Sequence, residues 1–297
     1  MAHYLPPDVI ARAQVLGLKA RTIVEGLRVG DHKSPYRGFS VEFVQHREYV
    51  PGDDIRHIDW KSYGRSERYT IKQYEQETNF AGHLLLDASR SMLYGEGDTN
   101  KLEYAKVLTA VLAYLIVHQR DSVSLNVFDA GWRDRLPASG QLGHVQTILH
   151  ALESVDPREK TAIAPLLHDL ASQVRRRGLV FLISDCFDQV DSILDGLQHL
   201  RFQGHEVIVF HILHPDEVDF PFTGMVKFDA MEETREVLAR PQLIRPAYLR
   251  ALTKYLDDLQ KGCEHNHCDY IRMNTAKPLA ETLTAYLARR IKVRLQV

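Results

Sequence analysis

The sequence has little cysteine, no long apolar run and no dominant charge of either sign. Three cysteines in 297 residues, Cys186, Cys263 and Cys268, are too few and too irregularly spaced for a disulfide framework, which favours a reducing compartment. The 37 basic and 39 acidic side chains leave a net charge of −2, so bulk charge does not indicate nucleic-acid binding. No stretch has the pattern of a membrane span or a secretory signal. We therefore expect a soluble, cytoplasmic protein.

Several motifs for nucleotide binding and catalysis are also absent. There is no G-x-x-x-x-G-K-[ST] loop, so the chain itself is not expected to bind ATP. Neither H-E-x-x-H nor G-x-S-x-G occurs, which excludes two common kinds of hydrolase site. Gly95 and Gly97 lie too far beyond the preceding predicted strand to form a dinucleotide-binding loop.

From residue 82 onward, predicted strands and helices alternate, which is typical of a parallel sheet with helices on both faces. Strands are expected at 82–87, 122–128, 179–184, 205–211 and 268–273, and helices at 101–118, 143–153, 163–176, 189–200, 246–261 and 278–292. Residues 131–136 are expected to form a short antiparallel edge beside 122–128. The predicted fold class is α/β, with a doubly wound, mostly parallel sheet in a domain spanning residues 81–297.

Residues 1–80 are expected to form an N-terminal helix followed by a two-stranded β extension. Apolar residues recur at helical spacing between Pro7 and Arg28, which predicts an amphipathic helix packed on the protein's own body. The segments 39–50 and 68–77 are rich in β-branched and aromatic residues and are expected to be strands. Between them, PGDDIRHIDWKSYGRSE gathers opposite charges around apolar anchors. We interpret this segment as an ion network that holds the strand pair, with a docking surface as the alternative.

The run LLLDASRSM, residues 84–92, is the most informative stretch of the chain. Its leucines predict a buried strand, and the polar residues begin where that strand should end. Asp87, Ser89 and Ser91 stand at alternate positions, so an extended backbone would aim their oxygens to one side. One carboxylate and two hydroxyls suit Mg²⁺ or Mn²⁺ and suit zinc poorly. The alternative is that Asp87 caps the following turn and the serines bond local backbone.

Two further oxygen-bearing side chains are expected at the same edge of the sheet. Asp185 follows the predicted strand LVFLIS, and Thr161 lies in the loop REKTAIAP before the next helix. In an open parallel sheet, ligands bind beyond the carboxyl ends of the strands, where these side chains should meet Asp87. The sequence therefore predicts a metal site made of Asp87, Ser89, Ser91, Thr161 and Asp185.

The same residues carry a family resemblance. LLLDASRSM, the loop containing Thr161, and LISDCFD resemble a von Willebrand factor A-type domain with its metal-ion-dependent adhesion site. The upstream segment VEFVQHREYVPGDDIRHIDWKSYGRSERYTIKQYEQE resembles the bacterial family called domain of unknown function fifty-eight, in which a PGDD-R-IDW stretch precedes such a domain. The resemblance is strong over residues 35–210 and weak elsewhere. It implies a partner of MoxR-type AAA+ ATPases and a metal site that binds rather than reacts.

The ligand set agrees with a binding role. By the resemblance, Asp87 and Asp185 act through waters, and the neutral hydroxyls leave the dication electron-poor with an open position for a Glu or Asp of a partner protein. We therefore expect a non-catalytic, metal-dependent protein-binding module that serves as adaptor of the ATPase in complex assembly or remodelling. The alternative is a metal-dependent hydrolase using the same oxygens, although no general base or nucleophile pair accompanies them. An aspartyl-phosphate mechanism at Asp87 would want a second acid where Ser89 stands.

The run CEHNHC, residues 263–268, contains residue types that bind zinc. These consecutive positions would crowd a tetrahedral site, unlike the spaced pairs of structural zinc. We expect a polar loop between a helix and a strand, with Cys268 entering the sheet.

Overall fold

The computed structural model describes residues 41–49, 60, 63–64, 68–76, 81–157, 159–229 and 236–294. The chain divides into two compact units, one of them Gly30–Asn79 and the other containing Phe80–Val297. The predicted helix between Pro7 and Arg28 lies outside the described residues, as does most of the PGDDIRHIDWKSYGRSE segment.

The smaller unit contains an antiparallel strand pair. β1 (Val41–Glu48) pairs with β2 (Thr70–Gln76), which confirms the two strands expected in this part of the chain. The amide of Tyr49 extends the pairing by donating to the carbonyl of Tyr69 at 2.9 Å. The ring of Tyr69 in turn stacks on Tyr63, with centroids 4.5 Å apart. Aromatic contacts of this kind supply packing that a two-stranded pair lacks by itself.

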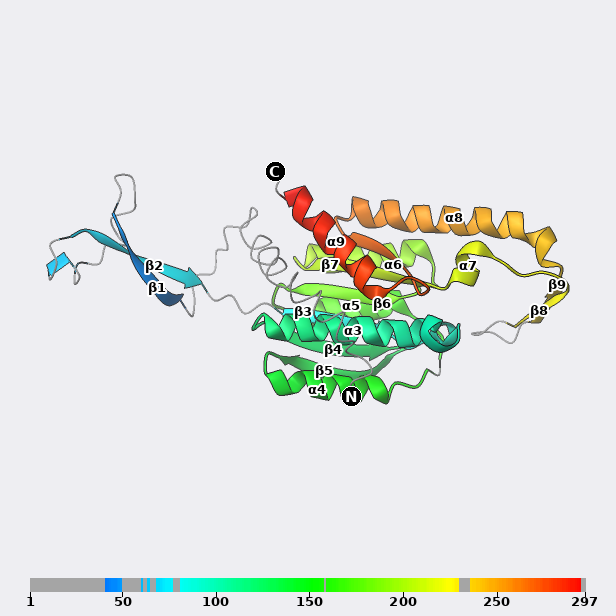
Figure 1. Ribbon diagram of the computed structural model, residues 1–297, viewed down its shortest axis with the longest axis horizontal. Helices are drawn as coiled ribbons and strands as arrows, with labels where there is room; N and C mark the ends of the chain where they lie inside the picture. The colour runs from blue at the N-terminus through cyan, green and yellow to red at the C-terminus, as the bar shows by residue number, and fades with distance from the viewer. Residues whose placement is uncertain are drawn as a thin grey trace. The chain divides into compact units, whose positions relative to one another are not determined.

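Within the described residues, the larger unit is built on a six-stranded sheet with the strand order β10-β7-β6-β3-β4-β5 (Figure 1). Its strands are β3 (Ala81–Asp87), β4 (Ser122–Phe128), β5 (Trp132–Ser139), β6 (Leu179–Ser184), β7 (Glu206–Leu213) and β10 (Asp269–Asn274), while β8 (Val226–Asp229) and β9 (Glu236–Ala239) form a separate pair. Neighbouring strands of the sheet run parallel, apart from β5, which is antiparallel to β4. The predicted parallel strands and the antiparallel edge are therefore confirmed.

Helices cover both faces of the sheet. The described helices are α3 (Lys101–His118), α4 (Leu142–Glu153), α5 (Ile163–Gln173), α6 (Val190–Phe202), α7 (Pro215–Asp219), α8 (Pro241–His265) and α9 (Leu279–Arg294), with short 3-10 turns η2 (Arg90–Leu93) and η3 (Gly97–Thr99). α3, α4 and α9 pack on one face, and α5, α6 and α8 pack on the other. The fold is thus doubly wound, as predicted. No helix in the described part of the chain combines the length and apolarity needed to cross a membrane.

The strands supply side chains to both cores by simple alternation. Leu84 and Leu86 of β3 join the core under α3, whereas Leu85 joins the core under α5 and α6. A strand that is covered on both faces is apolar at every position. This explains why the runs LLL in β3 and LVFLI in β6 do not alternate between apolar and polar residues. Gly196 of α6 allows close approach to α5, because a Cβ there would lie 2.9 Å from the Cβ of Leu167.

An arm made of α7, β8, β9 and the first turns of α8 extends the domain after β7 (Figure 1). α8 begins at Pro241, five residues before the predicted start at 246. Pro241 lies in the first turn of α8, a position that suits proline. Pro246 lies inside the helix. The ring of Phe220 packs on Tyr248 of α8 and Phe228 of β8, so the arm has a small aromatic core of its own.

The CEHNHC run forms the end of α8 and the turn into β10. Cys263 and Cys268 are buried in the core under α6, and the amide of Cys268 donates to the carbonyl of Cys263 at 2.8 Å. His267 takes a positive φ of 54° in the turn. The described residues contain no group of three or more His, Cys, Asp or Glu side chains placed to hold a metal, and CEHNHC is no exception.

Candidate metal centre

The predicted site residues lie at the carboxyl edge of the sheet, at the point where the strand order reverses. β3 and β6 are neighbours, but the chain proceeds from β3 to β4 on one side and from β6 to β7 on the other. Such a switch point is where doubly wound sheets bind their ligands. Asp87 is the last residue of β3, and Asp185 directly follows β6.

Asp87 is fully buried and is the centre of the cluster. Its Oδ1 accepts the amide of Ser89 at 2.9 Å, and its Oδ2 accepts the hydroxyls of Thr161 at 3.2 Å and Ser184 at 2.5 Å. Burial, and then repulsion from Asp185, raises the pKa of Asp87 to about 7, although the hydrogen bonds from Ser184 and Ser89 act in the opposite direction. The hydrogen-bond donors around this carboxylate are all neutral, so they do not balance its negative charge.

Ser89 and Ser91 lie at the start of η2, and both are buried. The amide of Met92 donates to the carbonyl of Ser89 at 3.2 Å, so the chain turns immediately after β3. This turn brings the Oγ atoms of the two serines within 3.0 Å of each other, and Ser91 lies close enough to the carboxylate of Asp185 to lower its pKa. The five predicted side chains are therefore gathered in one network of polar contacts.

The loop that carries Thr161 is held from two sides. The amide of Arg90 donates to the carbonyl of Glu159 at 3.1 Å, and the amide of Ala162 donates to the carbonyl of Asp129 at 3.1 Å. These bonds fix the loop between η2 and the end of β4. Thr161 itself is partly exposed, whereas Asp87 is fully buried, so the cluster opens towards solvent on the Thr161 side.

Ser184 and Lys101 also belong to the cluster, although sequence reasoning missed both. The Ser184 hydroxyl donates to Asp87 and accepts the amide of Cys186 at 2.8 Å. The ammonium of Lys101 donates to Oδ2 of Asp185 at 2.8 Å. A serine at a strand end carries no distinctive signal. Lys101 does, because it is the first residue of α3, where a positive charge opposes the helix dipole.

Lys101 sets the charge state of Asp185. Burial by itself would raise the pKa of Asp185, but the ammonium of Lys101 outweighs burial and holds the pKa below its ordinary value. Burial would likewise lower the pKa of Lys101, and the carboxylates of Asp185 and Glu217 raise it instead. Asp185 and Lys101 therefore form a buried ion pair beside the less well neutralised Asp87.

Residues 45–256 match the family described as protein of unknown function DUF58. The chain belongs to this family. Uncharacterized proteins of Mycobacterium tuberculosis and Mycobacterium bovis are 25% identical to the DUF58 chain over 268 residues, covering 86% of this chain and 83% of each relative.

Three solved structures are similar to parts of this chain. The conserved hypothetical protein BatB from Bacteroides thetaiotaomicron covers 72% of this chain and 99% of its own, with a TM-score of 0.45 and 16% identity. An aerotolerance-related membrane protein from Bacteroides fragilis covers 72% of this chain and 98% of its own, with a TM-score of 0.48 and 20% identity. The VWA domain of SpRpn10 has a TM-score of 0.41 and 13% identity over 70% of this chain and 95% of its own. The doubly wound α/β fold of the DUF58 chain rests on its own strand order and helix layers.

The donor set of the DUF58 cluster fits a hard divalent cation. Its contacting groups are hydroxyl and carboxylate oxygens, the ligands that Mg²⁺ prefers. Ser89, Ser91 and Thr161 would hold the ion, with Asp87 and Asp185 as its charged partners. A bound dication would supply the positive charge that the buried carboxylate of Asp87 lacks.

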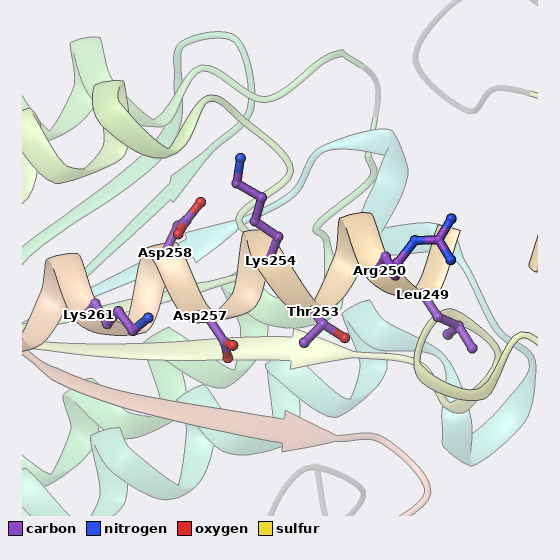
Figure 2. A pocket seen from close by; sticks show the side chains of 7 residues that line it. All are labelled: Leu249, Arg250, Thr253, Lys254, Asp257, Asp258 and Lys261. Atoms are coloured by element: carbon purple, nitrogen blue, oxygen red, sulfur yellow. The ribbon is translucent and has the colours of Figure 1, made fainter. Parts of the chain in front are cut away.

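A shallow depression of about 580 Å³ lies along the outer side of α8, apart from this cluster (Figure 2). All of its lining residues come from α8, among them Arg250 and Lys254. Asp257, also in the lining, pairs with Arg272 of β10 at 3.3 Å. A groove lined by a single helix is part of the solvated outer surface of that helix, so we place the chemistry of the DUF58 protein at the oxygen cluster.

Proposed function

We propose that this DUF58 protein is a non-catalytic protein-binding module. In this proposal its oxygen cluster holds Mg²⁺, or Mn²⁺ in its place, and offers the ion to an acidic residue of a partner protein. The observation that carries the proposal is the convergence of five side chains from three separate loops into one network at the switch point. A dication held largely by neutral hydroxyls remains electron-poor and keeps an affinity for carboxylates.

The surroundings of the cluster also favour binding over turnover. A hydrolase needs a base or nucleophile that reaches its substrate. His211, the imidazole that interacts with Asp185, is almost completely buried, and its Nδ1 pairs with the hydroxyl of Tyr270 at 2.6 Å. Burial lowers the pKa of His211 to about 4, even though Asp185 acts in the opposite direction. An imidazole held in this way is poorly placed to exchange protons with a bound substrate.

The partner that we propose is a MoxR-type AAA+ ATPase, which this protein would serve as an adaptor in assembling or remodelling other complexes. Two features support it. The segment with the PGDD-R-IDW stretch resembles the family members that accompany such ATPases, and the chain has no phosphate-binding loop of its own. A cytoplasmic location is part of the proposal, supported by Cys186, Cys263 and Cys268 being free and buried.

Metal binding is tested first, by calorimetric titration with Mn²⁺ and by thermal unfolding in Mg²⁺ or in EDTA. We expect saturable binding and a higher Tm in Mg²⁺, because a ligand that binds the native state stabilises it. Asp87→Asn should abolish both responses. Asp169→Asn is the matched control, because this carboxylate of α5 is bonded to Trp132 and lies outside the network. A wild-type protein without any metal response would contradict the proposal.

Partner binding is tested by co-purification of the ATPase with and without chelator. We expect capture to be lost in EDTA and in Asp87→Asn, and to be kept in Asp169→Asn. Capture that persists both in EDTA and in Asp87→Asn would show that the ATPase does not bind through the metal site. Turnover of a generic phosphate or ester substrate that Asp87→Asn abolishes would replace the binding module with the hydrolase alternative.

A further inference from the structure

Lys101 is a buried ammonium set against the second carboxylate of the cluster. Its side chain is 2% exposed, and its Nζ lies 2.8 Å from Oδ2 of Asp185 and 2.8 Å from Oε1 of Glu217. Burying a charged lysine is costly, and the first turn of a helix is the least favourable place in it for a positive charge. The cost indicates that the charge itself has a use.

Glu217, the second partner of the lysine, is held in place by α7 and α8. Its Oε2 accepts the amide of His214 at 2.8 Å, and its carbonyl accepts the hydroxyl of Tyr248 at 3.0 Å. Its side chain is 27% exposed, so it lies further towards solvent than Asp185. The ammonium is thus fixed between an inner acid that belongs to the cluster and an outer acid that does not.

The formal charges determine what a loaded site would bind. Asp87 and Asp185 together would neutralise a dication and leave it little attraction for a further anion. Lys101 cancels the charge of Asp185, so a bound dication would be balanced by Asp87 alone and would keep a net positive charge. That charge attracts a carboxylate at the open position, and the same ammonium repels the metal.

We propose that Lys101 sets the ligand preference of this site: its ammonium lowers the affinity for the metal and raises the affinity of the metal-loaded site for a partner's carboxylate. The inference rests on the proposed function, because it concerns the same cation. Glu217 acts in the opposite direction, because its negative charge offsets part of the positive potential that Lys101 produces at the site.

The test compares three variants of the full chain. Lys101→Met removes the charge and keeps an unbranched side chain. Glu217→Gln removes only the outer charge and keeps an oxygen for the amide of His214. Lys106→Met is the control, because Lys106 is also a buried lysine of α3 but pairs within the helix, with Glu103 at 2.9 Å.

Two affinities are measured on each variant: that for Mn²⁺ by calorimetry, and that of the Mn²⁺-loaded site for acetate by paramagnetic relaxation of the acetate methyl protons. In Lys101→Met we expect Mn²⁺ to bind about tenfold more tightly, as removal of a nearby unit charge predicts, and acetate to bind correspondingly more weakly. In Glu217→Gln both changes should have the opposite sign. Lys106→Met should match the wild type.

A lysine with a merely structural role would not move the two affinities in opposite directions. Unchanged or weakened Mn²⁺ binding in folded Lys101→Met would overturn the inference. If that variant does not fold, Glu217→Gln decides: weaker Mn²⁺ and tighter acetate binding support the inference, and any other result overturns it. A wild type that binds no Mn²⁺ overturns the proposed function itself, and so is distinguished from a failure of the lysine's role.

Discussion

The hydroxyl of Thr161 donates to Oδ2 of Asp87 at 3.2 Å, across 74 residues of sequence. The same oxygen accepts the hydroxyl of Ser184, from the end of a neighbouring strand, at 2.5 Å. One carboxylate oxygen therefore joins the end of β3, the loop before α5 and the end of β6. Thr161 faces the open side of the cluster, so its substitution should alter metal binding. Ser184 is fully buried, so its substitution should alter the stability of the fold.

Replacing Thr161 by valine should weaken metal binding without unfolding the protein. The substitution removes a proposed ligand oxygen and preserves the branched shape of a partly exposed side chain. We expect the Mn²⁺ dissociation constant to rise about tenfold, which corresponds to about 1.4 kcal/mol. Calorimetric titration measures it. Thr147→Val on the exposed side of α4, where the hydroxyl bonds only its own helix, is the control. Equal affinities in the two variants would remove Thr161 from the ligand set.

Ser184→Ala should destabilise the fold. The change leaves the buried carboxylate of Asp87 without its shortest hydrogen bond and the amide of Cys186 without an acceptor. We expect the free energy of unfolding to fall by about 1–3 kcal/mol, the usual cost of leaving buried polar groups unpaired. Urea denaturation gives the value. Ser172→Ala, an exposed serine of α5, provides the reference, and a loss no larger than this reference would contradict the expectation.

His83 should contribute a decrease in the free energy of unfolding as the pH falls below about 6.5. Its Nδ1 pairs with the hydroxyl of Ser124 at 2.8 Å, and its buried Nε2 has no partner within the described residues. Burial, and then the charge of His205, lowers the pKa of His83 from 6.5 to about 4. Between these values the unfolded chain binds the proton and the folded chain does not, so stability present above pH 6.5 is lost as the pH approaches 4.

The contribution of His83 is at most about 3 kcal/mol. In urea denaturation across this pH range, the free energy of unfolding should fall less, or rise more, on acidification in His83→Gln than in the wild type. Other buried groups also contribute: the lowered pKa of His211 acts in the same direction as His83, whereas the raised pKa of Asp87 acts in the opposite direction. His150→Gln, which changes an exposed histidine of α4, is the control. A His83→Gln slope identical to that of the wild type would rule out the buried imidazole as its source.

Leu86→Ala should cost far more stability than Leu142→Ala. Leu86 is completely buried in the core under α3, whereas Leu142 at the start of α4 is 67% exposed. The first truncation leaves a cavity and should lower the free energy of unfolding by about 2–5 kcal/mol. The second should stay within about 0.5 kcal/mol of the wild type. Similar losses in the two variants, measured by urea denaturation, would show that β3 is not the centre of the core.

The success of sequence reasoning differed between the sheet and the arm. β3 and β6 are covered on both faces, so each appears as an unbroken apolar run that periodicity identifies. β8 and β9 have four residues each, too few to establish an alternation. The predicted helix at 246–261 begins five residues too late, because α8 starts at Pro241 and continues through Pro246, a residue that ordinarily interrupts a helix.

The amino-acid sequence by itself determined the order of strands and helices in the sheet domain and the placement of five oxygen-bearing residues after strand ends or in a loop at one edge. Local periodicity encodes the former, and the common direction of parallel strands implies the latter. Only the tertiary structure decided which charges meet there. Lys101 reaches Asp185 and Glu217 across 84 and 116 residues, and such contacts depend on how α3, β6 and α7 pack together, which no local pattern records.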